Sequence, residues 1–161
     1  MKKLILLALV AMMISSCAGS KNVRVAKKTI KGDWILDHVS YNDLRAFKVT
    51  LFNDASKECF EKSLWHFVPN NNTGTYEMQN AQCDSGKRYF SFTIQEINPE
   101  KGLFDFLLKP TDEKKRSKDN KGFRLHLKHL SADAMQWEQS LMMDGEPFII
   151  HMNFSKIEKQ Q

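Results

Sequence analysis

The chain has 161 residues, 42% of them hydrophobic and 11 of them Phe, which favours a single domain with a substantial core over a disordered chain. It carries 24 basic and 19 acidic residues, for a formal net charge of +5, and two of the basic residues, Lys2 and Lys3, belong to a leader that should be removed. The small excess that remains is an ordinary solubility charge. A nucleic-acid partner, which would require a concentrated basic face, is therefore not expected.

The N-terminus has the organisation of a secretory signal. Lys2 and Lys3 precede an apolar run from Leu4 to Ile14, which is too short to span a bilayer. Ile14-Ser15-Ser16-Cys17 resembles a bacterial lipobox, and this resemblance implies cleavage before Cys17 and acylation of that cysteine. We therefore expect residues 1–16 to be a lipoprotein signal peptide. The alternative is an ordinary signal peptide in which Cys17 has no special role.

The residues after Cys17 indicate the location of the anchored protein. Ala18, Gly19 and Ser20 include neither the Asp that would favour inner-membrane retention nor the acidic cluster that would favour surface export. We expect a lipid anchor in the outer membrane, on its periplasmic side. Residues 17–31 would then form a lipidated N-terminus and a polar tether, with a possible short strand from Asn22 to Val25.

The segment from Tyr89 to Lys109 has the clearest secondary-structure pattern. Its apolar residues share one face in each of two arms, with Phe90, Phe92 and Ile94 in the first and Phe104, Phe106 and Leu108 in the second. The turn residues Asn98 to Gly102 separate the arms. This alternation predicts a β-hairpin with one buried face, which needs further strands to cover it.

The rest of the chain supplies those strands. Strands are expected over Gly32–Tyr41, Phe47–Phe52, Leu64–Val68, Thr75–Met78, and the alternating segments that contain Leu125, Trp137 and Ile150. One short helical segment is expected near residues 55–63, and long helices are not expected. Eight to ten short strands joined mainly by short turns predict an all-β domain over residues 32–157, built as an antiparallel up-and-down meander that closes as a barrel or folds as a sandwich.

Few residues form patterns that indicate chemistry. In an oxidising compartment Cys59 and Cys83 are expected to form a disulfide, with two free buried thiols as the alternative. No Cys-x-x-Cys, paired histidines, nucleophile motif or phosphate loop is present, so we expect neither a metal ion, nor a cofactor, nor an enzyme. The basic stretch Lys109 to Lys121 is interleaved with acidic residues and is expected to be a solvated loop.

Gly32-Asp33-Trp34 at the start of the first main strand, and the stretch from Cys59 to Cys83, resemble the lipocalin-like (calycin-type) domain of small Gram-negative lipoproteins. The resemblance implies a barrel of about eight strands with a cavity. It also implies that Trp34 packs at the closed end, where Lys156 is the nearest counterpart of the Arg that lipocalins place on their last strand.

Two functions from different classes remain open. The first is binding of a small hydrophobic molecule inside the barrel, with a candidate lining that comprises Phe92, Phe106, Leu125, Trp137 and Ile150. The second is a non-enzymatic interaction or structural module of the cell envelope, with a packed core. A hollow interior would favour the first function and a filled interior the second; the sequence identifies no protein partner.

Overall fold

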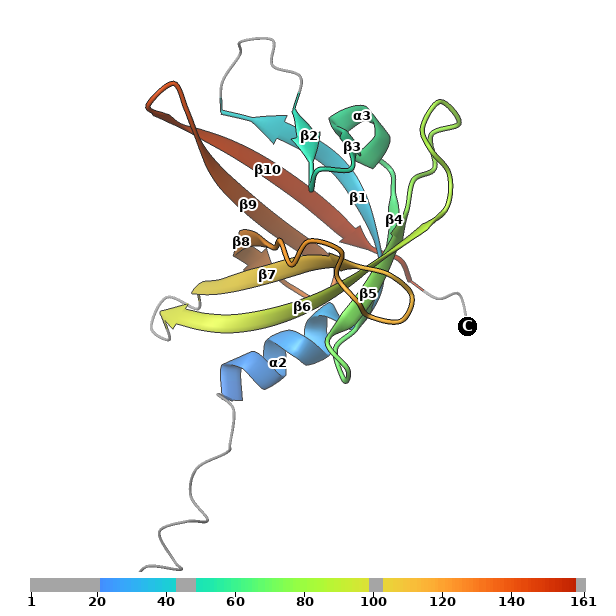
Figure 1. Ribbon diagram of the computed structural model, residues 1–161. Coiled ribbons are helices and arrows are strands. Elements are labelled where there is room, and N and C mark those ends of the chain that lie inside the picture. The colour runs from blue at the N-terminus through green and yellow to red at the C-terminus, as the bar shows by residue number, and fades with distance from the viewer. Residues whose placement is uncertain (1–20, 43–48, 99–102, 159–161) are drawn as a thin grey trace, which may run out of the picture.

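Eight antiparallel strands form a closed barrel (Figure 1). The computed structural model describes residues 21–42, 49–98 and 103–158, so the expected signal peptide and Cys17 lie outside the described residues. The barrel strands are β1 (Gly32–Tyr41), β4 (Leu64–Val68), β5 (Thr73–Glu77), β6 (Lys87–Asn98), β7 (Leu103–Thr111), β8 (Phe123–Leu130), β9 (Ala134–Met143) and β10 (Glu146–Lys156). From β4 to β10 each strand pairs with the next along the chain.

Strand β1 closes the barrel between the first and last strands of this meander. Gly32 lies opposite Phe67 of β4, and Trp34 lies opposite Lys156 of β10. The expected all-β, up-and-down barrel of eight strands is therefore confirmed, and the sandwich alternative is excluded. Closure gives every barrel strand a paired neighbour on both sides.

The hairpin of β6 and β7 is the one that the alternation predicts. Phe92 lies opposite Leu108 and Ile94 opposite Phe106, and all four side chains are buried. The intervening polar residues of β6 point outward. Most of the expected turn, residues 99–102, lies outside the described residues.

The structure differs from the strand that the sequence predicts from Phe47 to Phe52. Only β2 (Thr50–Leu51) is a strand there among the described residues, and it pairs with β3 (Ala55–Ser56) in a separate two-stranded sheet. Helix α3 (Lys57–Phe60) follows, inside the helical segment that was expected. Phe52 and Asn53 both adopt positive φ, 53° and 56°, which turns the chain back before it can join the barrel.

The segment expected to be a tether or short strand is instead a helix, α2 (Lys21–Ile30). The reason is the helical spacing of Val23, Ala26 and Ile30, which places the last two in the buried core while the charged residues remain outside. The helix reaches across one end of the barrel, from Glu96 of β6, which accepts a hydrogen bond from Asn22, to the end of β10.

Trp34 and Lys156 fix the C-terminal end of α2 to this closed end. Trp34 Nε1 donates a hydrogen bond to the carbonyl of Ile30 at 2.8 Å, and Lys156 Nζ donates to the carbonyl of Thr29 at 2.7 Å. The Lys156 Nζ also lies 4.9 Å from the centre of the Trp34 ring, and its burial lowers the pKa of this amine. The stacked pair implied by the lipocalin resemblance is therefore present.

Candidate functional site

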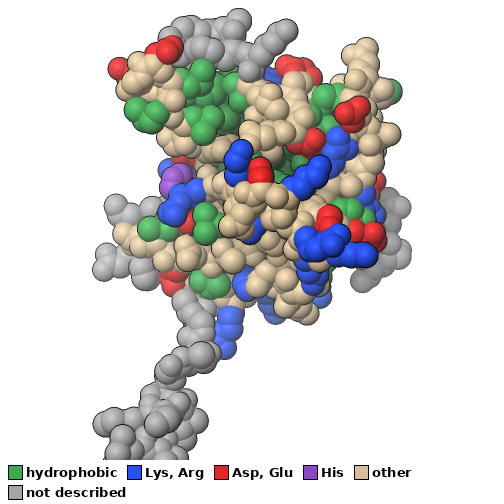
Figure 2. Space-filling view, in the orientation of Figure 1, with side chains coloured by type: hydrophobic (Ala, Val, Ile, Leu, Met, Phe, Trp, Pro, Cys, Tyr) green, Lys and Arg blue, Asp and Glu red, His purple; other side chains and the backbone are tan. Residues whose placement is uncertain are grey.

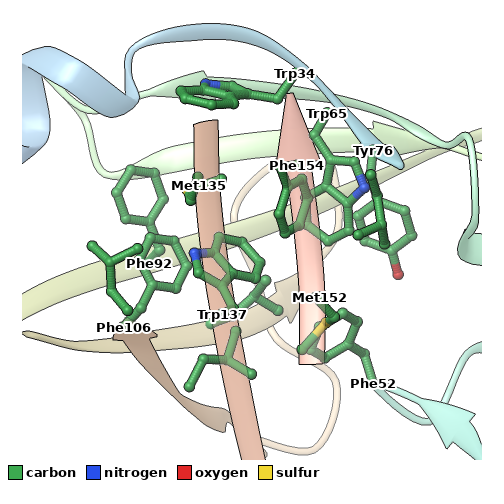
Figure 3. Packing of buried hydrophobic residues seen from close by; sticks show 14 of the residues in the cluster. Trp34, Phe52, Trp65, Tyr76, Phe92, Phe106, Met135, Trp137, Met152 and Phe154 are labelled. Carbon is green, nitrogen blue, oxygen red and sulfur yellow. The ribbon is translucent and has the colours of Figure 1, made fainter. Parts of the chain in front are cut away.

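The five expected lining residues all lie in the buried core of the barrel (Figure 3). The rings of Phe92 and Phe106 stack with centroids 4.9 Å apart, and those of Phe106 and Trp137 lie 4.7 Å apart. Leu125 and Ile150 are no more than 1% exposed. These side chains therefore meet in one interior, as the alternation predicted.

That interior is filled by rings at the level of Trp137. Besides Phe106, the Trp137 ring lies 4.7 Å from Phe154, 5.6 Å from Trp65 and 5.9 Å from Phe67, centre to centre. These distances are those of aromatic rings in contact, and the partners come from β4, β7 and β10. At this level the middle of the barrel is thus a packed core of aromatic rings.

Trp137 differs from the other two tryptophans in its hydrogen bonding. Trp34 Nε1 donates to Ile30, and Trp65 Nε1 donates to Ser63 Oγ at 2.8 Å. Trp137 is fully buried, and its Nε1 has no acceptor among the described residues. A buried donor without a partner costs about 1–3 kcal/mol, and no hydrogen bond to a described residue orients this ring, which packs against Phe106 and Phe154.

A cavity of about 700 Å³ lies at the opposite end of the barrel from α2, between the β2–β3 turn and the loop that joins β7 to β8. We call it the mouth pocket; its apolar wall is formed by Phe52, Pro110 and Phe123, and its polar lining comprises Asn53, Thr111, Asp112, Arg116, Ser117, Lys118, Asp119 and Lys121. In Figure 2 the face toward the viewer is hollowed, with hydrophobic side chains in the hollow and Lys and Arg side chains around it. The volume lies in the range typical of small-molecule sites.

The cations of the mouth pocket are held differently from one another. Arg116 is fixed to Asp112 by its backbone N–H and by its side chain, each at 2.8 Å, and the backbone hydrogen bond is the main cause that lowers the pKa of the Asp112 carboxyl. Lys121 pairs loosely with Asp119 at 3.7 Å. Lys118 is exposed and has no carboxylate partner among the described residues.

Ser117 adds a polar atom that lacks a partner. Its Oγ is buried and makes no hydrogen bond with any described residue, although the side chain lines the mouth pocket. A hydroxyl can donate one hydrogen bond and accept two. The exposed amine of Lys118 is a donor suited to a negatively charged group, and rotation of the Ser117 side chain would add its hydroxyl as a second donor.

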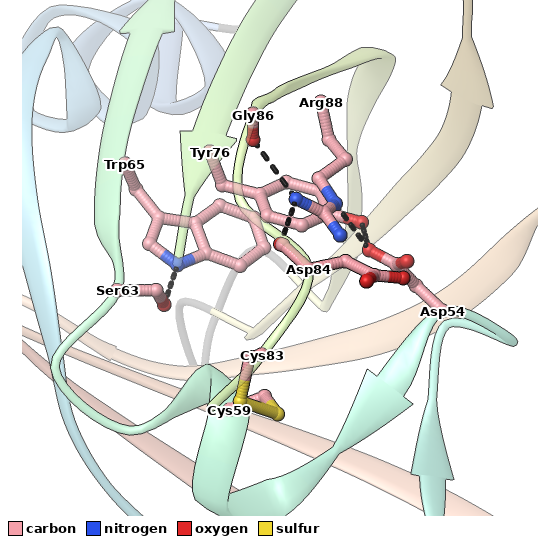
Figure 4. A network of polar contacts seen from close by, with 9 residues as sticks. All are labelled: Asp54, Cys59, Ser63, Trp65, Tyr76, Cys83, Asp84, Gly86 and Arg88. Carbon is pink, nitrogen blue, oxygen red and sulfur yellow. Dashed lines mark hydrogen bonds and ion pairs between the residues drawn. A yellow bond between two sulfur atoms is a disulfide. The ribbon is translucent and has the colours of Figure 1, made fainter. Parts of the chain in front are cut away.

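The wall that carries Phe52 is held by a network of polar contacts and a disulfide (Figure 4). Asp54 accepts hydrogen bonds from Tyr76 Oη at 2.7 Å and from Arg88 Nε at 3.0 Å. Burial, reinforced by Asp54, raises the pKa of the Tyr76 hydroxyl, which therefore stays protonated as a donor. The expected disulfide between Cys59 and Cys83 is confirmed, and it ties α3 to the β5–β6 loop.

An outward-facing row of acids and histidines was missed by the sequence analysis, which found no paired histidines. Asp105, which is 4% exposed, lies 2.8 Å from His126 Nδ1 through Oδ1 and 2.6 Å from Arg124 through Oδ2. On the next strands Glu138 lies 3.2 Å from His151. Strand register places these residues side by side, and the polar faces of predicted strands are the signal that could have found them.

This row carries no sign of a catalytic or metal centre. No group of three or more His, Cys, Asp or Glu in the described part of the chain could hold a metal ion. Asp105 contacts Arg124 and His126, and Glu138 contacts Lys128 and His151, so each of these carboxylates has its partners on the outward faces of neighbouring strands. The mouth pocket is therefore the stronger candidate site.

Comparisons with known proteins found similarity among solved structures alone. A comparison with protein-family models found no match, and neither did a comparison with curated proteins. Among solved structures, the chain is similar to a lipocalin-like protein from Bacteroides uniformis, with 12% sequence identity and a TM-score of 0.49 over 80% of this chain and 99% of the other. The closed barrel described above stands on its own strand pairing.

Proposed function

We propose that this protein is a lipid-anchored, non-enzymatic binding protein of the cell envelope, with a lipocalin-like barrel that takes a small amphiphilic molecule at its mouth pocket. The observation that carries the proposal is this pocket, in which an apolar wall faces unpaired polar groups. The mouth pocket replaces the centre of the barrel as the binding site, because aromatic rings fill the centre.

The lining suggests the chemistry of the ligand. Phe123 is half-buried and lies 5.3 Å from the buried ring of Phe52 in an edge-to-face arrangement, so its ring offers a surface for an apolar body. Ser117 Oγ and Lys118 Nζ are available to a carboxylate, sulfate or phosphate group. An anionic amphiphile, such as a fatty acid, matches both halves of the pocket.

Phe52 separates the mouth pocket from the core. Its ring is 3% exposed and lies 6.1 Å from Trp65, while its backbone has the positive φ that a bulky residue rarely adopts. Unusual backbone at a bulky residue often marks a ligand clamp. The β2–β3 turn therefore presents the ring as a fixed floor for a ligand.

A binding titration with a fluorescent anionic fatty acid and its neutral methyl ester tests the proposal. We expect saturable, competable binding that is tighter for the acid. Ser117→Ala and Lys118→Gln should each weaken binding of the acid roughly tenfold, because each removes one hydrogen bond to a charged group. The matched control is Lys114→Gln, which changes an exposed cation of the same loop outside the pocket lining and should bind like wild type.

Equal binding of the acid by all three variants would contradict a site at the mouth pocket. Absence of saturable binding across a panel of anionic and neutral lipids would favour the second candidate function, an interaction or structural module of the cell envelope. The filled barrel centre is the observation that favours this second function, since a barrel whose interior is packed acts through its surface.

The proposed location is the outer membrane, on its periplasmic side, with anchoring through acylated Cys17. Its support is the lipobox-like sequence Ile14 to Cys17 and the absence of acidic residues directly after it. Within the described residues, no helix is long and apolar enough to cross a membrane.

A further inference from the structure

Helix α2 carries a face of exposed cations. Lys21, Arg24 and Lys28, followed by Lys31 directly after the helix, are all exposed. At about 100° per residue, their positions fall within about 80° of one another around the helix axis. The buried residues lie on the opposite side, against the barrel. The sequence of α2 contains no acidic residue that would balance this charge.

The cations of this face are free of carboxylate partners among the described residues. Val25, one turn from Lys21 and from Lys28, is 57% exposed and lies on the same side of the helix. Exposed cations around an aliphatic side chain are typical of a helix that lies on a membrane surface.

The barrel holds this face in a fixed orientation. Lys27 Nζ donates to Asn72 Oδ1 at 2.7 Å in the β4–β5 turn, and Trp34 and Lys156 bind the C-terminal end of the helix. The cations are therefore presented together, at the closed end of the molecule. Figure 2 shows Lys and Arg side chains gathered along this end.

We propose that the exposed cationic face of α2 docks on anionic phospholipid headgroups of the membrane that anchors the chain. The inference rests on the proposed anchoring at Cys17, which lies four residues before the helix. Four residues span at most about 14 Å, so acylation would bring α2 to the headgroups. The barrel then stands on its closed end, with the mouth pocket facing away from the membrane.

Cosedimentation with lipid vesicles tests this docking without the acyl chains. The test uses a soluble form that begins at Ala18, directly after the cysteine of the proposed anchor. We expect binding to vesicles that contain phosphatidylglycerol, weak binding to pure phosphatidylcholine, and loss of binding at high salt. Each cation near an anionic leaflet strengthens binding roughly fivefold, so Arg24→Gln with Lys28→Gln should weaken it by at least tenfold.

The matched control is Lys62→Gln with Lys114→Gln, which removes the same charge from the opposite end of the barrel. We expect it to bind vesicles like wild type. Equal weakening of both double variants would mean that net charge alone drives binding and would overturn the proposal, as would equal binding to neutral and anionic vesicles. Thermal unfolding of each variant checks that the barrel is intact, and the fatty-acid titration of the same proteins reports on the mouth pocket separately.

Discussion

At the scale of single residues, the three buried tryptophans share an environment but differ in one bond. All three are at most 1% exposed, yet only Trp34 and Trp65 have acceptors for their indole N–H groups. For Trp137 the free energy gained from ring contacts must exceed the cost of the unpaired donor. Replacing either Trp137 or Trp65 by Phe makes the same change in the side chain, so the two variants can be compared directly.

We expect the free energy of unfolding of Trp137→Phe to lie within about 1 kcal/mol of the wild-type value. Removal of the unpaired donor offsets part of the free energy lost with the smaller ring. Trp65→Phe loses the same area together with the hydrogen bond to Ser63, and it should be less stable than the Trp137 variant by about 1 kcal/mol or more. Urea unfolding measures both. Trp137→Ala should cost about 3–5 kcal/mol, since its ring is packed among four others. A Trp137→Phe protein that is less stable than the Trp65→Phe protein would contradict this account.

Gly74 is a second residue whose role is defined by its neighbours. A Cβ at this position of β5 would lie against the ring of Phe90 and 2.7 Å from the carbonyl oxygen of His66. Because the oxygen belongs to a paired strand and the ring is buried, neither can move freely. We expect Gly74→Ala to lower the free energy of unfolding by about 1–3 kcal/mol in urea titrations. The control is Thr75→Ala, on the same strand β5 as Gly74. Gly86→Ser would not serve as a control, because Gly86 has a positive φ that a serine rarely adopts.

At the scale of elements, sequence patterns identify strands well and the pieces that cover the barrel ends less well. The β6–β7 hairpin follows from strict alternation of apolar and polar residues. Helix α2 does not, because Val23 and Val25 also fit a strand. The helix is stabilised by burial of Ile30, by the bond from the nearby Trp34, and by a bond from Lys156, which is 127 residues away from its acceptor Thr29.

The mouth pocket could not be predicted for a related reason. It joins Phe52 of the β2–β3 turn to the loop after β7, and both conformations depend on contacts made after the barrel has closed. The alternation placed Trp137 correctly in the interior. It could not show that rings from three other strands would fill the space around it, because side-chain volume in a closed barrel is a property of the whole set of strands.

The disulfide between Cys59 and Cys83 stabilises one of these covering elements. It bridges a sequence separation of 24 residues, for which chain-entropy arguments give about 3 kcal/mol. We expect reduction to lower the melting temperature in scanning calorimetry. Because α3 and the Asp54–Tyr76 bond lie in the same region, reduction should also loosen the wall that carries Phe52 and weaken fatty-acid binding. Unchanged melting after complete reduction, verified by alkylation of both thiols, would contradict the stabilising role.

At the scale of the whole molecule, the two ends of the barrel have different chemistry. Helix α2 and its cations cover one end, while the mouth pocket opens at the other. A chain anchored just before α2 would therefore expose its pocket to the periplasm. In the proposed arrangement two kinds of membrane attachment would be combined: an acyl anchor that salt does not affect, and an electrostatic contact that salt weakens.

Replacement of Cys17 separates these two attachments. We expect Cys17→Ala to remove the acyl anchor, so that a high-salt wash releases the protein from membranes into the soluble fraction, whereas wild type stays in the pellet. At low salt part of the variant should remain bound, because the cations of α2 still contact anionic lipids. Adding Arg24→Gln and Lys28→Gln should then release it at low salt as well.

Immunoblots of washed membrane fractions give the measurement, with Cys59→Ala and Cys83→Ala together as the control that keeps the anchor. Retention of the Cys17 variant after a high-salt wash would show that another segment, such as an uncleaved leader, holds the chain in the membrane.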